Sequence, residues 1–66
     1  MKYQIEFEQE QDGRWIAEIA ALPGVMAYGS SRNDAESKVE AMALRVIADR
    51  IERENTTMTQ VQFAVA

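Results

Sequence analysis

Acidic side chains are the residues of this chain best suited to chemistry. They stand at Glu6, Glu8, Glu10, Asp12, Glu18 and Asp34. A carboxylate cluster can hold Mg²⁺ for the hydrolysis of a phosphodiester, so one interpretation is a nuclease site. The other is that Glu6, Glu8 and Glu18 form the solvated face of two strands. Their alternation with apolar residues favours this second interpretation.

Two serines, Ser30 and Ser31, offer hydroxyl groups that could act as nucleophiles. A serine nucleophile needs a base nearby, and the chain has no histidine, no cysteine and no other base at a suitable position. We therefore interpret both serines as helix caps. The sequence predicts no catalytic centre, no cofactor and no metal site, and thus a protein that is not an enzyme.

Two aromatic residues, Trp15 and Tyr28, could stack on the bases of a single-stranded nucleic acid. Trp15 lies on the apolar side of an alternating segment and is predicted to be a core residue, whereas Tyr28 stands beside Gly29 and remains a candidate contact residue. The net charge of −4 argues against direct binding of DNA or RNA, which requires clustered Lys and Arg. It suits a basic protein partner.

The length of 66 residues indicates one domain, residues 1–66. A chain of this size buries only about 60% of its unfolded surface. Small domains usually gain stability from disulfides, a metal or oligomerisation. Because the chain has no cysteine or histidine, we expect a homodimer or a higher even oligomer.

The N-terminal segment is not a signal peptide, because it alternates and carries acidic residues. No apolar run approaches the roughly 20 residues that cross a bilayer. We expect a cytoplasmic protein with no membrane contact.

Three strands are predicted before the middle of the chain, the first over residues 2–8 with Tyr3, Ile5 and Phe7 on its apolar face. Asp12-Gly13 predicts a hairpin turn, with positive φ at Gly13. The second strand covers residues 14–19, with Trp15, Ala17 and Ile19 toward the core and Ile16 on the opposite face. Pro23-Gly24 predicts a turn, and residues 25–28 form a third strand that ends at Gly29. Met26 and Met42 are interpreted as core or gap-filling residues.

A helix is predicted from Ser31, the N-cap, to about residue 53. Asp34 takes the place of the usual Glu of a capping box, although its shorter side chain reaches the N-cap amide less well. Leu44 and Ile51 lie at the edge of the apolar stripe. The stripe itself contains Ala35, Val39, Met42, Ala43, Val46 and Ile47.

The tail, residues 58–66, alternates again and predicts a last strand with Val61, Phe63 and Val65 toward the core. The element order β-β-β-α-β predicts an α+β two-layer sandwich, in which one long helix packs across an antiparallel sheet. The other sheet face is polar, and an exposed edge strand can pair with another chain.

The order of short motifs resembles the HicB family of antitoxins from type II toxin–antitoxin systems. The chain contains Asp-Gly-Arg-Trp, then Leu-Pro-Gly-Val, then a glycine two residues before the N-cap serine, and a helix with ALRVIADRIE. The resemblance covers nearly the whole chain. Its matching positions are Asp12, Gly13, Trp15, Ala17, Glu18, Leu22, Pro23, Gly24, Val25, Gly29, Ser31 and Ala35.

This resemblance implies a truncated ribonuclease-H-like fold without the nuclease carboxylates. It also implies a function, namely to bind and sterically block a small basic HicA-type toxin that cleaves messenger RNA. Many HicB proteins carry a C-terminal DNA-binding module, for which this chain has no room after its last strand, so direct DNA binding is not expected. Our candidates for the toxin-binding surface are Glu6, Glu8, Glu10, Glu18 and Tyr28.

The residues also leave another function open. An orphan, homo-oligomeric HicB-like domain could bind a different protein or a small ligand. A residual Mg²⁺-dependent nuclease is a third interpretation, which would depend on Glu6 and Asp12.

Overall fold

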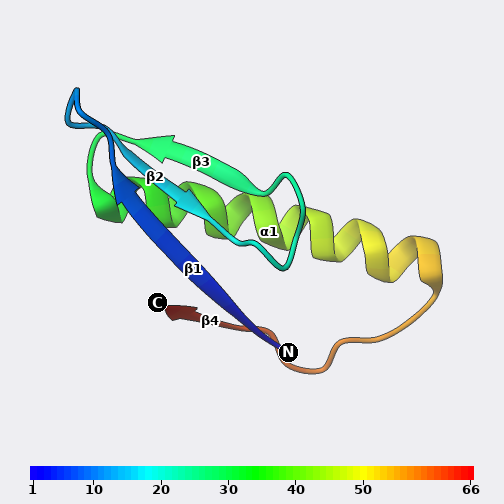
Figure 1. The fold of residues 1–66 in the computed structure, drawn as a ribbon. Coiled ribbons are helices and arrows are strands. Elements are labelled where there is room, and N and C mark those ends of the chain that lie inside the picture. Colours follow the sequence, from blue (N-terminus) through cyan, green and yellow to red (C-terminus); the bar gives the residue numbers. More distant parts are fainter.

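The computed structural model describes all residues, 1–66, and contains four strands and one helix (Figure 1). The strands are β1 (Lys2–Gln9), β2 (Trp15–Glu18), β3 (Met26–Gly29) and β4 (Gln62–Val65), and the helix α1 (Arg32–Glu54) lies between β3 and β4. The predicted order β-β-β-α-β is confirmed, with boundaries within two residues of those expected except at the start of β4. The helix packs across one face of the sheet, which confirms the α+β two-layer sandwich. The ribonuclease-H-like character stays a prediction.

The four strands form one sheet in the order β3-β2-β1-β4. The first three strands pair antiparallel as predicted, whereas β4 pairs parallel to β1, from Lys2 opposite Gln62 to Ile5 opposite Val65. The sheet is therefore mixed, and the expectation of a wholly antiparallel sheet is wrong for its last strand.

The length of the helix explains the parallel strand. Gly29 at the end of β3 lies opposite Trp15, which lies opposite Gln9, so α1 begins near the end of β1. A helix of 23 residues is about 35 Å long and carries the chain back to the start of β1. The chain then enters β4 beside Met1 and runs in the direction of β1 (Figure 1).

The helix ends are capped by side-chain and backbone hydrogen bonds. The backbone N–H of Asp34 donates to Ser31 Oγ at 3.0 Å, which confirms Ser31 as the N-cap. At the other end Asn55 adopts the left-handed conformation, with φ 49°, and its N–H donates to the carbonyl of Ile51. Asparagine is one of the few residues other than glycine that enter this region readily.

The core lies between α1 and the inner face of the sheet. The fully buried helix residues are spaced four apart, which is the predicted stripe. Met42 and Val46 flank it and are half-buried against the core. The buried apolar side chains are Tyr3, Ile5, Ala17, Ile19, Leu22, Val25, Ala35, Val39, Ala43 and Ile47.

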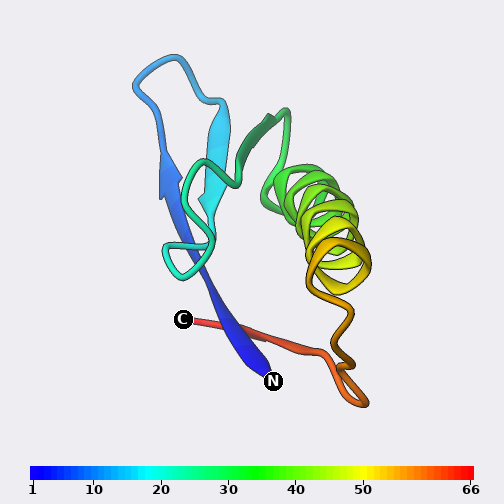
Figure 2. The same ribbon diagram turned by 90° about the vertical axis from the view of Figure 1, so that its right-hand side faces the viewer.

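The helix does not cover the whole sheet. It packs on β3 and β2, while β4 lies at the far edge, away from it (Figure 2). As a result Phe63 is only half-buried and Val65 is 47% exposed. The prediction that Val65 is a core residue is therefore wrong: its neighbour Ile5 is buried, but no helix covers the last residues of β4.

Gly29, at the end of β3, lies very close to the backbone of the first turn of α1. A Cβ on Gly29 would fall within 2.3 Å of the backbone nitrogen of Ala35. Gly29 thus permits the contact between β3 and the first turn of α1, besides ending the strand.

The two turn glycines behave as predicted, since φ is 94° at Gly13 and 84° at Gly24.

No helix of the structure has the length and hydrophobicity that a bilayer crossing requires.

Candidate protein-binding face of the sheet

The outer face of the sheet, opposite the helix, collects the predicted contact residues in two rows. Pairing places Glu6 opposite Glu18, and Glu18 opposite Met26, so these three side chains form one row. The second row consists of Glu8, Ile16 and Tyr28. Because alternate residues of a strand point to the same side, both rows lie on one face.

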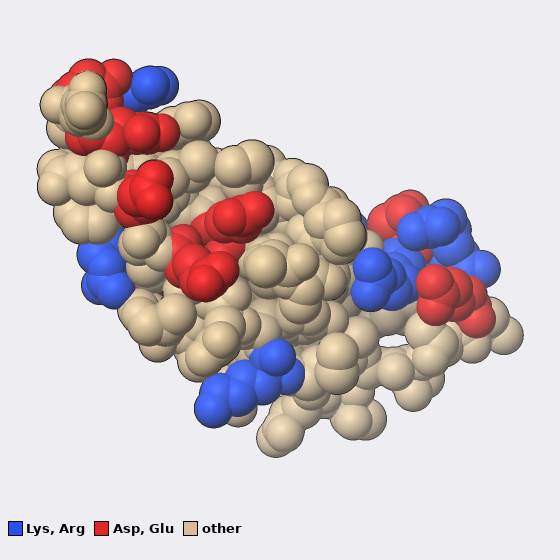
Figure 3. Space-filling model, viewed as in Figure 1, with Lys and Arg blue, Asp and Glu red and all other residues tan.

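The carboxylates of this outer face have no basic partner. The three ion pairs of the molecule join Arg14 to Asp12 at 2.8 Å, Lys38 to Asp34 at 3.1 Å, and Arg53 to Asp49 at 2.7 Å. None of them involves a glutamate of the two rows. Figure 3 shows the acidic side chains gathered over β1, β2 and the hairpin tip, with most basic side chains at the margins and at the helix end. The outer face is therefore a local concentration of uncompensated negative charge.

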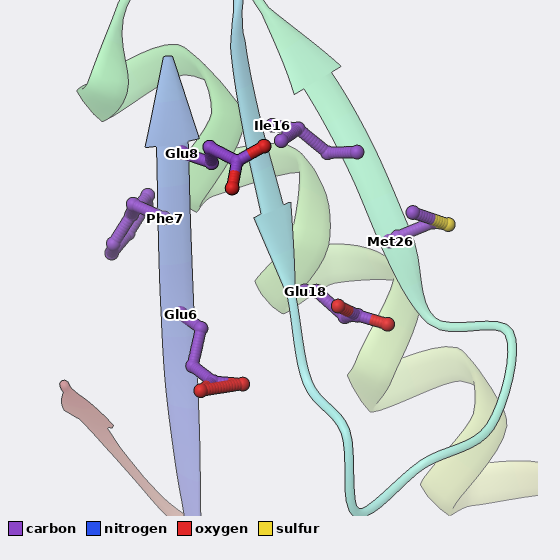
Figure 4. A pocket seen from close by; sticks show the side chains of 6 residues that line it. All are labelled: Glu6, Phe7, Glu8, Ile16, Glu18 and Met26. Atoms are coloured by element: carbon purple, nitrogen blue, oxygen red, sulfur yellow. The ribbon is translucent and has the colours of Figure 1, made fainter. Parts of the chain in front are cut away.

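A shallow hollow lies between the two rows (Figure 4). Its lining combines the carboxylates of Glu6, Glu8 and Glu18 with the apolar side chains of Ile16 and Met26. Phe7 borders the hollow from β1, but its ring is turned away to the side and lies under the guanidinium of Arg32. Figure 4 shows the carboxylates of Glu6 and Glu18 extending from neighbouring strands above the sheet. Such a surface offers apolar contact area together with hydrogen-bond acceptors. None of its side chains can donate a hydrogen bond when the carboxyl groups are ionised.

The last candidate residue, Glu10, lies at the hairpin tip, where it contacts Tyr28 at the end of the second row on β3. The hydroxyl of Tyr28 donates to Glu10 Oε1 at 3.4 Å, and the guanidinium of Arg14 lies 4.6 Å from the centre of the Tyr28 ring. Tyr28 is nevertheless 45% exposed. These contacts fix the ring at the end of the acidic rows, where it can still meet a partner.

The turn that carries these contacts is itself stabilised by Asp12. Its carboxylate accepts from the backbone N–H of Arg14 at 3.1 Å and from Arg14 Nε at 2.8 Å. The backbone hydrogen bond from Arg14 is the main reason why the pKa of Asp12 is lowered. Asp12 is thus a turn residue, and the structure gives it no position beside Glu6.

The two serines are occupied by the helix start. Ser31 caps α1, and the backbone N–H of Ser30 donates to Asp34 Oδ2 at 3.0 Å. The carboxylate of Asp34 therefore reaches the residue before the N-cap and not the N-cap itself. That backbone hydrogen bond, followed by the one from Lys38, lowers the pKa of Asp34.

One carboxyl group with a raised pKa lies elsewhere, on the flank of α1. Partial burial raises the pKa of Glu40, and the neighbouring carboxyl of Glu36, one helical turn away, adds to this effect. These two residues belong to the helix and not to the acidic rows.

The acidic residues do not gather into a metal site. No group of three acidic side chains lies close enough together to hold a metal ion. The nuclease interpretation would require such a set.

The structure corrects the predicted position of Met26 and adds a role for Ile16. Met26 was predicted to fill the core, yet it is 41% exposed and closes the first row beside Glu18. Ile16 lies on the outer face as expected and lines the hollow. The sequence contained a signal for this position of Met26. Val25 and Ala27 are apolar residues two positions apart, and residues with a period of two share one face of a strand, so Met26 between them points to the opposite face. In the structure Val25 is buried and Ala27 is half-buried.

Comparisons of the chain with models of known families, with characterised proteins and with solved structures give no significant match.

Proposed function

We propose that this protein is a binding protein whose acidic outer face docks a basic protein, in the manner of a HicB antitoxin that blocks a HicA-type toxin. One observation carries the proposal: Glu6 and Glu18 stand directly opposite each other in the sheet without a basic partner. Like charges directly opposite each other destabilise a sheet. A basic partner would convert this unfavourable arrangement into a favourable one.

The composition of the face supports a protein partner. Ile16 and Met26 provide apolar contact area between the carboxylates, and Tyr28 provides an exposed aromatic ring. Protein interfaces combine apolar and aromatic anchors with charges that select the partner and speed the encounter. A small toxin rich in Lys and Arg has the complementary chemistry.

The inhibition is steric in this proposal. The protein contributes no reactive group; it covers the toxin's active site while its carboxylates pair with the basic residues that would otherwise hold RNA phosphates. Affinity should then fall as salt concentration rises, because pairs at the rim of an interface are screened.

The test is co-expression with a small basic HicA-type toxin. We expect rescue of toxin-induced growth arrest and a stable complex by size-exclusion chromatography with light scattering. The double variant Glu6→Lys, Glu18→Lys should abolish both effects. The matched control, Glu52→Lys with Glu54→Lys, reverses the same number of charges on the exposed end of α1 and should retain both.

The outcome also decides between the antitoxin function and the orphan domain. If the folded protein neither binds nor neutralises the toxin, the antitoxin function is wrong, and the orphan domain becomes the better interpretation. If the control variant loses binding as well, the interface lies outside the outer face.

A further inference from the structure

The strand β3 ends the sheet on one side and presents a free backbone edge. The sheet order β3-β2-β1-β4 leaves one side of β3 without a neighbouring strand (Figure 1). The backbone N–H of Ile19 donates to the carbonyl of Val25 at 3.0 Å. In an antiparallel pair alternate residues hydrogen-bond to the same neighbour, so Ala27 also bonds to β2. Met26 and Tyr28 therefore direct their N–H and C=O groups to the open side.

Nothing within the chain occupies this edge. No hydrogen bond of the turns, loops or caps engages the backbone of Met26 or Tyr28. Natural edge strands are often protected against pairing by a lysine, a proline or a bulge. The strand β3 reads Met-Ala-Tyr-Gly, without a charged residue and without proline. The edge ends at Ser30, whose N–H is held by the carboxylate of Asp34 at 3.0 Å, so it can pair with a segment of a few residues.

The outer side of this edge continues the two rows of the outer face. Its side chains are Met26 and Tyr28, which are 41% and 45% exposed. A residue of an added strand opposite Met26 would lie about 10 Å from Glu18, two strand spacings away. A lysine or arginine side chain spans this distance with its stem along Met26 and its charge near the carboxylate.

The inner side of the edge borders the helix. Lys38 of α1 and Tyr28 line the same hollow. Residues four apart lie on one side of a helix, so Met42 follows Lys38 along β3. Met42 and Ala27 are half-buried apolar residues. A residue opposite Ala27 in an added strand would point to this inner side, where an apolar side chain fits and a second cation would be repelled by Lys38.

The other edge strand, β4, has different surroundings. It lies along residues 2–5 of β1, whose only charged side chain is Lys2. In contrast, β3 lies beside β2, which carries Glu18 without a basic partner. Charge therefore attracts a basic segment to the edge of β3 and not to that of β4.

We propose that a basic partner protein adds a short extended segment to the free edge of β3 as a fifth strand of the sheet. The segment carries Lys or Arg opposite Met26 and Tyr28, and an apolar residue opposite Ala27. In this mode of recognition backbone hydrogen bonds supply affinity and alternate side chains supply specificity. The proposal rests on the proposed function only in taking the partner to be basic; it adds where that partner is anchored and which sequence pattern it presents.

The experiment is an NMR titration of the full chain with the synthetic peptide Val-Lys-Val-Lys-Val, acetylated and amidated at its ends. We expect the largest amide shifts at Met26 and Tyr28, whose N–H groups gain a hydrogen bond. The control is the same peptide methylated on every backbone nitrogen, which keeps the charge and the side chains but has no backbone donor. It should bind at least about tenfold more weakly.

A variant of the chain tests the same edge from the other side. Met26→Pro removes an N–H that no other residue of the chain uses, and proline is tolerated at such edge positions. The matched control is Met26→Ala, which removes the side chain but keeps the N–H. Met26→Pro should bind the peptide at least about tenfold more weakly than Met26→Ala does. If Met26→Pro fails to fold by circular dichroism, the comparison of the two peptides on the natural chain decides.

The outcomes distinguish this proposal from the proposed function. If the two peptides bind alike, or Met26→Pro binds like Met26→Ala, charge is recognised without strand addition and the proposal is wrong, whatever the co-expression test gives. A peptide that leaves the amides of Met26 and Tyr28 unshifted also overturns it. If light scattering then shows a dimer that the peptide leaves intact, a second copy occupies the edge. Strand addition without neutralisation of the toxin would instead keep this proposal and remove the antitoxin function.

Discussion

Glu6 on β1 and Glu18 on β2 are cross-strand partners on the outer face of the sheet, and no cation lies between them. Such a pair costs stability, and a chain this small has little stability to spare. Placing two carboxylates there is easier to understand if the face has to receive positive charge from another molecule. The relationship also yields a direct stability test.

Glu18→Gln should stabilise the isolated protein, because it removes the repulsion between Glu18 and Glu6. We expect a gain of about 0.2–1 kcal/mol in the free energy of unfolding. Urea denaturation followed by circular dichroism measures it. The gain should shrink in 1 M salt, where surface charges are screened.

The control for this prediction is Glu8→Gln. Glu8 lies on the same strand and the same face, but its cross-strand partner is Ile16. Its neutralisation should change stability less than that of Glu18. Equal effects of the two substitutions would show that net charge, and not the specific pair, governs stability.

Gly29→Ala should destabilise the contact between β3 and the helix. The added Cβ would lie 2.3 Å from the backbone nitrogen of Ala35, and backbone atoms cannot turn aside as a flexible side chain can. We expect a loss of about 1–3 kcal/mol from overpacking. The denaturation midpoint measures the loss.

The comparison for Gly29→Ala is Gly13→Ala, whose Cβ would meet no atom within 4 Å but whose φ of 94° is strained for alanine. Both variants lose stability for different reasons. Only Gly29→Ala should speed hydrogen exchange in the first turn of α1. A midpoint equal to that of the natural protein would refute the close approach.

The helix start should depend on pH through Asp34. Its pKa in the folded state is lowered below 3.8, first by the backbone hydrogen bond from Ser30 and then by Lys38. A lowered folded-state pKa means that the carboxylate stabilises the protein above pH 4, and that this contribution is lost as pH falls through the folded-state pKa. Asp34→Asn should therefore be less stable than the natural protein at pH 7, with the difference fading below pH 4.

Two further variants separate this effect from general acid denaturation. Ser31→Ala removes the N-cap hydroxyl and should cost about 0.5–2 kcal/mol at every pH, since a hydroxyl does not titrate in this range. Glu54→Gln removes an exposed carboxylate that has no ion pair in the structure and should leave the pH profile unchanged. A pH-independent Asp34→Asn difference would contradict the assigned hydrogen bond.

Tyr3→Phe should not destabilise the protein, although Tyr3 is only 2% exposed. Its hydroxyl is a buried side-chain oxygen without a hydrogen-bond partner. Such a group carries a desolvation penalty of about 1–3 kcal/mol, which phenylalanine avoids while keeping the ring packed against Phe63. Thermal unfolding measures the effect, and a clearly lowered melting temperature would mean that the hydroxyl has a partner in solution.

The sequence alone determined the elements and most of the inward-facing residues. Alternation of polar and apolar residues placed Tyr3 and Ile5 inside, and Asp12-Gly13 and Pro23-Gly24 marked turns that the structure contains. Ser31 was identifiable as the N-cap because capping depends on residues only three positions apart. These are local properties, set by period, backbone freedom and short-range hydrogen bonds.

Tertiary structure alone decided how these elements meet. The parallel pairing of β4 with β1, the exposure of Val65 and the cross-strand pairing of Glu6 with Glu18 depend on where a 23-residue helix returns the chain and which strands it covers. Alternation gives each strand two faces, but it does not give the direction or the neighbour of the strand. Direction and neighbours follow from contacts between residues far apart in the chain, which no local pattern records.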